Sequence, residues 1–204
     1  MADIYLWSGE VTPALRAYLQ QIASPARAAR AARLGRAEDA ERCLMGEALL
    51  RLALPERRDF NYTYGPHGKP LLDGVHFNLS HSGRYVACAV ADAAVGVDVQ
   101  TVRPQQAGAA VRLLDAEEAA RAGDDIKAVF ALFCAKEAVG KWHGEGLSFA
   151  KRVHIKADGT VMQNGQPLPC RVQWLPLPDA VLAVCGADAA VRLIEVTESQ
   201  LCCP

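Results

Sequence analysis

The sequence predicts an α+β protein made of two halves, in each of which a helix packs on an antiparallel sheet. Long helices are expected at residues 38–54 and 125–143. Each helix is followed by short segments rich in β-branched residues and separated by turn residues, which is the pattern of antiparallel strands. Because helix and then sheet occur twice along the chain, we expect an N-terminal half at 1–103 and a C-terminal half at 104–204.

The N-terminal half is expected to begin with two short helices. Thr12-Pro13 and Ser24-Pro25 each combine an N-cap residue with a proline that fits the first helical turn. The longer helix at 38–54 carries an apolar stripe that we assign to the core, and Pro55 ends it.

A loop and three strands should complete this half. The run from Tyr64 to Pro70 is rich in glycine and proline, so we expect a loop at 59–73. The predicted strands follow at about 75–80, 85–91 and 94–100.

The C-terminal half repeats this order. Asp115 begins a capping box with Glu118, and Gly144 is placed to end the helix at 125–143. Asp158-Gly159 and Asn164-Gly165 have the composition of hairpin turns. Strands are expected near 153–157, 160–163, 171–175, 181–185 and 191–196.

Composition restricts the classes of function. With 204 residues, 51% of them hydrophobic, the chain can bury one large core or two small ones in contact. A formal net charge of −1 argues against general nucleic-acid binding. No segment has the roughly 18 uncharged apolar residues of a membrane helix, so we expect no membrane partner.

The start of the chain and its cysteines indicate a cytoplasmic protein. The residues after Met1 lack the basic start of a secretion signal. Seven cysteines, an odd number without paired metal-ligand spacing, fit a reducing compartment. Cys202 and Cys203 at the C-terminus receive no function.

Two carboxylates carry the functional hypothesis. In the strand Gly96-Val97-Asp98-Val99-Gln100, the side chains of Asp98 and Gln100 should share one face. In the helix, Glu137 and Lys141 are one turn apart and share a face. Two hard oxygen ligands and a lysine suit Mg²⁺ bound to a pyrophosphate.

Each fragment alone has an ordinary structural interpretation. A strand of alternating valine and polar residues is usually half buried, and a glutamate four residues before a lysine is usually a surface ion pair. The order of the fragments favours the functional interpretation. Phe77-Asn78-Leu79-Ser80-His81-Ser82-Gly83 precedes Gly96-Val97-Asp98, then Lys136-Glu137-Ala138 follows, and Gly144-Glu145-Gly146-Leu147 closes the series.

This series closely resembles the 4′-phosphopantetheinyl transferases of the surfactin-synthetase-activating type, which load the phosphopantetheine arm of coenzyme A onto carrier proteins. The resemblance runs from about Ser24 to Leu147 and implies a pseudo-dimer of two similar α+β halves with the active site in the cleft between them. It also implies that the protein acts on apo acyl or peptidyl carrier proteins. Because two halves already lie in one chain, we expect a monomer.

The resemblance further implies roles for individual residues. Asp98 and Glu137 would bind Mg²⁺, with Mn²⁺ as an alternative ion, and Gln100 would be a third metal ligand. Glu137 would also accept the proton of the carrier serine, and Lys141 would neutralise the phosphate. The implied contacts to coenzyme A are Arg27, Arg30, Cys43, Lys69, Ser80, His81, Lys141 and, as a weaker candidate, Lys136.

Arg27, Arg30 and Arg33 should lie on one helical face, which could equally be a solvated surface. Cys43 departs from the family, in which a hydroxyl occupies this position. Gln100 also departs, because many relatives have a carboxylate there, and a neutral amide oxygen contributes less charge to a metal site.

The implied reaction is attack of a carrier serine on the β-phosphate of coenzyme A, which releases adenosine 3′,5′-bisphosphate. Two other functions remain open from the sequence. One is a non-catalytic coenzyme A or carrier-protein binding module of the same fold, which would not require Asp98, Glu137 and Lys141 together. The other is a phosphoryl transferase for a different nucleotide, although the chain has no P-loop or kinase signature.

Overall fold

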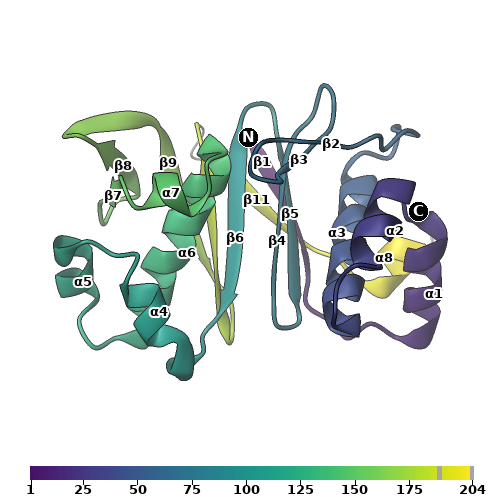
Figure 1. Cartoon of the computed structure of the whole chain (residues 1–204), viewed down its shortest axis with the longest axis horizontal. Helices are drawn as coiled ribbons and strands as arrows, with labels where there is room; N and C mark the ends of the chain where they lie inside the picture. Colours follow the sequence, from purple (N-terminus) through teal and green to yellow (C-terminus); the bar gives the residue numbers. More distant parts are fainter. Residues whose placement is uncertain (188–189, 203–204) are drawn as a thin grey trace.

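Two β-sheets face each other at the centre of the molecule, and helices cover their outer sides (Figure 1). The computed structural model describes residues 1–187 and 190–202. Apolar side chains from both sheets form a shared core, which includes Ile4, Leu6, Val97 and Leu182. The α+β class predicted from the sequence is confirmed.

The first lobe consists of the four-stranded sheet β11-β1-β5-β4 and four helices. Its strands are β1 (Ala2–Trp7), β4 (His76–Ser82), β5 (Tyr85–Ala91) and β11 (Val191–Glu195). Its helices are α1 (Pro13–Ile22), α2 (Pro25–Ala31), α3 (Ala37–Ala53) and α8 (Glu198–Cys202), and the short strands β2 (Thr63–Tyr64) and β3 (Pro70–Leu71) pair in the loop between α3 and β4. Figure 1 shows these helices together on one side of the sheet.

The second lobe consists of the five-stranded sheet β6-β10-β9-β8-β7 and the helices around α6. The strands are β6 (Val95–Thr101), β7 (His154–Ile155), β8 (Thr160–Gln163), β9 (Gln166–Pro176) and β10 (Ala180–Gly186). The helical elements are η1 (Pro104–Gln106), α4 (Ala107–Val111), α5 (Ala116–Ala122), α6 (Ile126–His143) and α7 (Leu147–Ala150). Helix α6 packs directly on β6 and β10.

The predicted helix starts are confirmed by their hydrogen bonds. Thr12 and Ser24 accept backbone N–H groups of the first turns of α1 and α2, and Asp115 forms the full capping box with Glu118. Gly144 ends α6 with a φ of 99°, which lies in the left-handed region that favours glycine. The sequence therefore predicted where α1, α2 and the helix at Ala116–Ala122 begin and where α6 ends, whereas α2 ends at Ala31 and does not include Arg33.

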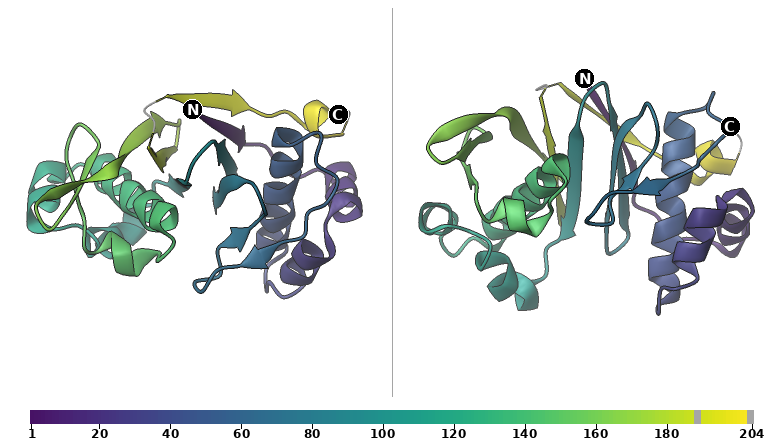
Figure 2. Two further views of the ribbon diagram at one scale, coloured as in Figure 1. Left: turned by 90° about the horizontal axis from the view of Figure 1, so that it is seen from above. Right: turned by 45° about the horizontal axis from the view of Figure 1, so that its top comes forward.

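The sheets do not follow the predicted division of the chain at residues 103 and 104. Strand β6, from the expected N-terminal half, pairs with β10 in the second sheet. Strand β11 returns to the first sheet and pairs in parallel with β1, so this sheet is mixed. Figure 2 shows β11 running back from the second lobe beside β1. The second lobe is thus an insertion between β5 and β11.

Candidate active site

Asp98 is held at the meeting of the two lobes. It lies on β6, its side chain is almost fully buried, and Val97 and Val99 face the opposite core, as the alternation predicted. Ser80 of β4 donates a hydrogen bond to Asp98 Oδ1 over 2.7 Å, and Gln100 Nε2 donates to Oδ2 over 2.8 Å. The thiol of Cys134 on α6 donates to the backbone carbonyl of Asp98 over 3.1 Å. Asp98 is therefore fixed from three elements.

Lys141 brings a positive charge to this carboxylate. Its ammonium lies 2.6 Å from Asp98 Oδ1, and it also donates to Ser80 Oγ over 3.0 Å and to the Val97 carbonyl over 3.1 Å. Three oxygen atoms thus surround a lysine that comes from the second lobe, one turn beyond Glu137. The sequence prediction that β6, β4 and α6 converge on one site agrees with this geometry.

Glu137 offers a second, differently placed carboxylate. It is half buried, and within residues 1–187 and 190–202 it has no hydrogen bond or ion pair. Burial is the main cause that raises its pKa above the ordinary value; the negative charge of Asp98 adds to this, and Lys141 opposes it. A divalent cation bound by both carboxylates would offset the negative charge of Asp98 that acts on Glu137.

Gly96 allows α6 to approach β6 closely enough for these contacts. A Cβ atom at Gly96 would lie 2.0 Å from the Ala138 carbonyl oxygen and 2.5 Å from the Trp142 nitrogen. Both are backbone atoms, so they cannot move without shifting the helix.

Gly96→Ala is therefore expected to lower the free energy of unfolding by at least the ~1–3 kcal/mol typical of an overpacked core. Thermal denaturation would measure this loss. Gly35→Ala is the matched control, because no atom lies within 4 Å of a Cβ at that position. Equal melting temperatures for both variants would contradict the close approach of β6 and α6.

Lys69 adds a second ammonium beside Lys141. It comes from the loop between α3 and β4, and its Nζ donates to the Lys141 carbonyl over 2.8 Å. Burial, followed by the charge of Lys141, lowers the pKa of Lys69. Lys69, Asn78 and Lys141 line a cavity of about 200 Å³ next to the carboxylates. The loop predicted from its glycines and prolines thus places a lysine at the site.

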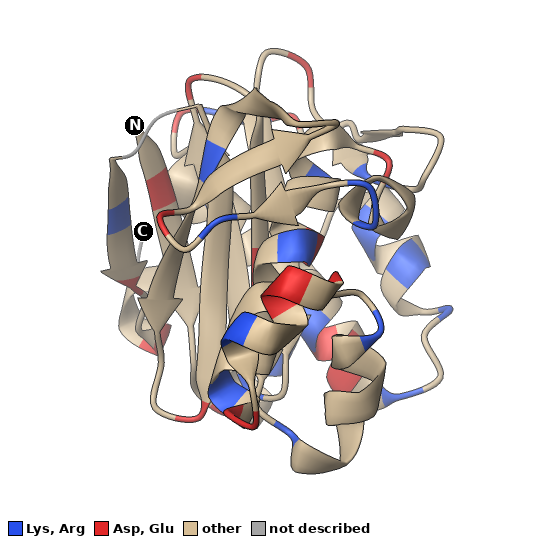
Figure 3. Cartoon of the chain, turned by 90° about the vertical axis from the view of Figure 1, so that its left-hand side faces the viewer, with Lys and Arg blue, Asp and Glu red and all other residues tan. Residues whose placement is uncertain are grey.

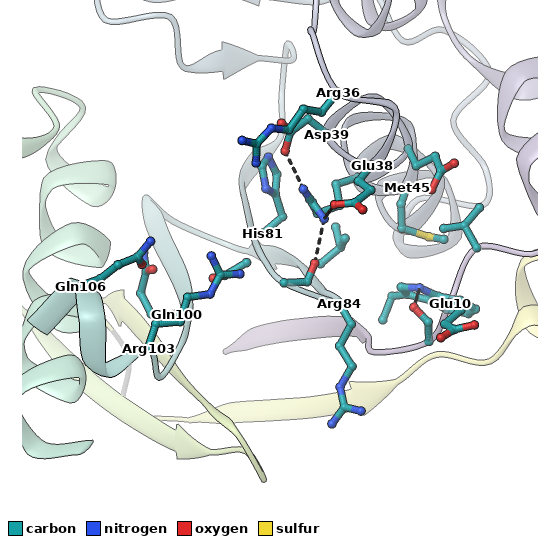
Figure 4. Close-up of a pocket in the computed structure, with 18 residues that line it drawn as sticks. Glu10, Arg36, Glu38, Asp39, Met45, His81, Arg84, Gln100, Arg103 and Gln106 are labelled. Carbon is teal, nitrogen blue, oxygen red and sulfur yellow. Dashed lines mark hydrogen bonds and ion pairs between the residues drawn. The ribbon is translucent and has the colours of Figure 1, made fainter. Parts of the chain in front are cut away.

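His81 lines a second, larger cavity of about 670 Å³. Figure 4 shows Gln100, Arg103 and Gln106 from the second lobe opposite His81 and Arg36 from the first. Asp98 and Glu137 do not line this cavity, but Gln100 lines it and donates a hydrogen bond to Asp98. Partial burial and the positive charges of Arg42 and Lys141 lower the pKa of His81, so the ring is mostly neutral at pH 7 and can donate a hydrogen bond.

Gln100 extends the oxygen-rich face of β6. Its amide nitrogen is used by Asp98, and no hydrogen bond is formed by its amide oxygen within the part of the chain that the structure describes. The donor set of two carboxylates and one amide oxygen has the hard-ligand chemistry that Mg²⁺ prefers. The residues present therefore fit a divalent cation.

Gln100→Glu should tighten Mg²⁺ binding by on the order of tenfold, because a charge beside a cation contributes at least ~1 kcal/mol even in water. Without metal the variant should be less stable than the parent, since it loses the hydrogen bond to Asp98 and gains a third negative charge. Thermal denaturation across a Mg²⁺ titration would measure both effects. A folded but completely inactive variant would argue against a place for Gln100 at the site.

The expected face of arginines is not present, because Arg27 is buried and Arg30 is exposed. Arg27 is buried between α2 and α3, and its Nη2 donates to the backbone carbonyl of Cys43 over 2.7 Å, so Cys43 contributes its main chain and not its thiol. The Arg27 Nε is buried without a partner in the described part of the chain. Arg30 and Arg33 are exposed.

Lys136 does not join the other candidate residues. Its side chain is fully buried on another side of α6, where its ammonium lies 2.9 Å from Glu118 Oε2 and donates to the Val153 carbonyl. Because Lys136 is buried in this ion pair, its ammonium cannot also contact a phosphate in the cleft. We therefore exclude Lys136 from the site, which corrects the expectation.

A second group of possible metal ligands, Asp115, Glu118 and His154, lies near this ion pair. Their ligand atoms lie within 4.8 Å of one another, but hydrogen bonds already use them. Glu118 accepts the backbone N–H groups of Asp115 and Ile155, and His154 Nδ1 is 2.8 Å from Asp115 Oδ2. With the Lys136 ammonium inside the group, a structural role explains these residues better than a metal site.

Lysine, arginine and acidic residues are interspersed over the face of the second lobe (Figure 3). Among the helices of residues 1–187 and 190–202, none is long and apolar enough to cross a membrane. Cys43, Cys88, Cys134, Cys170, Cys185 and Cys202 are free thiols, and Cys203 lies outside the described residues.

Comparison with known proteins defines the class of this fold and site. Residues 94–185 match the sequence profile of the 4′-phosphopantetheinyl transferase superfamily, which is almost the whole second lobe. The chain is 35% identical to the 4′-phosphopantetheinyl transferase psf-1 of Bacillus pumilus, over 78% of this chain and 76% of the relative. It is 28% identical to the 4′-phosphopantetheinyl transferase Sfp of Bacillus subtilis strain 168, over 80% of this chain and 82% of the relative. The chain belongs to the 4′-phosphopantetheinyl transferase family.

Proposed function

We propose that this enzyme transfers the phosphopantetheine arm of coenzyme A to a serine of apo acyl or peptidyl carrier proteins. The observation that carries the proposal is the convergence of Asp98, Glu137 and Lys141 between two cavities, in a chain that belongs to the transferase family. A non-catalytic binding module is not favoured, because binding alone would not require this combination of carboxylates and lysine.

Positively charged and hydrogen-bonding side chains near the two carboxylates would bind the diphosphate of coenzyme A. Lys69 and Lys141 line the smaller cavity, and the neutral His81 lines the larger one. Ser80 uses its hydroxyl hydrogen on Asp98 and accepts from Lys141, so its main contribution is to orient these two groups. Arg30 is exposed and provides a further donor for phosphate oxygens, whereas Arg27 is buried and holds the main chain of Cys43.

Asp98 and Glu137, with Gln100 as the third ligand, would hold Mg²⁺, or Mn²⁺ in its place. When bound, the cation supplies charge neutralisation at the diphosphate. Positioning and neutralisation of charge dominate such transfers.

The proton and the leaving group are assigned to residues of the second lobe. As the serine oxygen forms its bond to the β-phosphorus, Glu137 accepts the serine proton; burial raises its pKa and makes it a better base than an exposed glutamate. The bond between the β-phosphorus and the bridging oxygen breaks, and adenosine 3′,5′-bisphosphate leaves. Lys141 neutralises the charge that develops on this leaving group.

The test is to incubate the protein with coenzyme A, Mg²⁺ and an apo carrier protein, and to weigh the carrier by mass spectrometry. We expect a gain of one phosphopantetheine arm that EDTA abolishes. No gain with several acyl and peptidyl carriers, while coenzyme A still binds, would favour the binding module instead. We also propose a cytoplasmic monomer, which is supported by the free thiols and by the presence of both lobes in one chain.

A further inference from the structure

Strands β4 and β6 are neighbours across the boundary of the lobes, but they belong to different sheets (Figure 1). They are joined by side chains of β4 that accept backbone N–H groups of β6. Asn78 Oδ1 accepts from Val97 over 2.9 Å, Ser80 Oγ from Val99 over 3.2 Å, and Ser82 Oγ from Thr101 over 3.0 Å. Each donor is 19 residues beyond its acceptor, so the three bonds form a regular series, which we term the seam.

The seam completes the hydrogen bonding of β6. One edge of β6 pairs with β10, and the N–H groups of alternate residues point to the opposite edge. An unpaired backbone N–H group is costly when it is buried, and Asn78 and Ser80 are themselves almost fully buried. The short polar residues at alternate positions of β4 supply the acceptors that a neighbouring backbone would supply in a continuous sheet.

The bonds of the seam lie on either side of Asp98. The N–H groups of Val97 and Val99 flank it, and the carbonyl of Val97 accepts a hydrogen bond from Lys141. A shift of β6 relative to β4 would therefore move the carboxylate and the lysine contact together. Side chains of β4, in the first lobe, thus hold β6, the strand of the second sheet that carries Asp98.

We propose that Asn78 and Ser82 are positioning residues of the transferase, which set the place of Asp98 and Lys141 by holding the backbone of β6. The expected effect on kcat rests on the proposed function. The hold of Asn78 and Ser82 on the backbone of β6 can be tested without it. Ser80 is not used in the test, because it also contacts Asp98 and Lys141 directly.

The experiment combines amide hydrogen exchange with kinetics for Asn78→Leu, which removes the acceptor with little change in size. Exchange at the Val97 amide should accelerate at least tenfold, whereas the Asp98 amide, on the edge of β6 that pairs with β10, should keep its protection. The kcat for carrier modification should fall by about 10- to 100-fold, as expected for a small misplacement, with the KM for coenzyme A changed less than twofold.

Ser82→Ala and Ser82→Thr provide a milder comparison in case Asn78→Leu does not fold. Ser82→Ala should accelerate exchange at Thr101 and lower kcat, whereas Ser82→Thr keeps the hydroxyl and should restore both. Ser199→Ala, in the exposed part of α8, is the control for loss of a serine hydroxyl.

Unchanged exchange at Val97 and Thr101 would overturn the inference. A raised KM with an unchanged kcat would also overturn it, because the residues would then act as substrate contacts. If the parent protein modifies no carrier, the proposed function fails, and the exchange comparison still decides whether the seam holds β6.

Discussion

Replacement of Glu137 by glutamine is expected to lower turnover by about 10²–10⁴-fold, the usual loss when a general base is removed. The amide has nearly the same shape as the carboxylate, so packing on α6 should be preserved. It cannot accept the serine proton, and it removes one of the two negative charges proposed to bind the cation. Mass spectrometry of an apo carrier over time would measure the rate.

The effect of Glu137→Gln must be separated from a general loss of acidic charge. Glu195→Gln, on the exposed edge strand β11, removes the same charge away from the cleft and should retain the parent rate. Because Glu137 makes no hydrogen bond or ion pair in the described part of the chain, the melting temperature should change little. A loss of less than tenfold in turnover would contradict its assignment as the base.

Asp98→Asn should reduce turnover to a similar extent and raise the Mg²⁺ concentration needed for half-maximal rate. It should also destabilise the fold, because the ammonium of Lys141 would lose its carboxylate partner at 2.6 Å. The Lys141 side chain is 26% exposed, so the cost should be about 1–3 kcal/mol, below that of a fully buried pair. Rate measurements over a Mg²⁺ titration and thermal denaturation would test the two effects.

The control for Asp98→Asn is Asp3→Asn, which breaks the ion pair with Arg192 between β1 and β11. This pair is more exposed, so its loss should cost at most ~1 kcal/mol and leave the Mg²⁺ requirement unchanged. An Asp98→Asn enzyme with the same Mg²⁺ requirement as the parent would exclude Asp98 as a metal ligand.

Local signals in the sequence predicted most elements of the fold. Capping residues and Gly144 defined the helix ends, and alternating valines defined β6. The strand β1 was not predicted, although the buried Ile4 and Leu6 alternate with the more exposed Asp3 and Tyr5. The pairing of β11 with β1 has no local signal, since it joins residues at opposite ends of the chain.

The site was predictable where a residue's role depends on its position along one element. Asp98 faces α6 because of the two-residue period of β6, and Glu137 and Lys141 share a face because of the helical period. Lys136 was misassigned because its partner Glu118 comes from a different helix, which the spacing within α6 does not reveal. The seam was missed for the same reason, because Asn78 and Ser82 act on a strand of the other sheet.

The insertion of the second lobe between β5 and β11 also affects how the protein is made. Strand β1 leaves the ribosome before the second lobe, but its parallel partner β11 leaves only after that lobe. Until Val191–Glu195 emerge, one edge of β1 has no partner strand, while all five strands of the second sheet are already synthesised. During translation the inserted lobe can therefore complete its sheet before the lobe that encloses it in the sequence, and β11 can pair with β1 only after the inserted lobe has been synthesised.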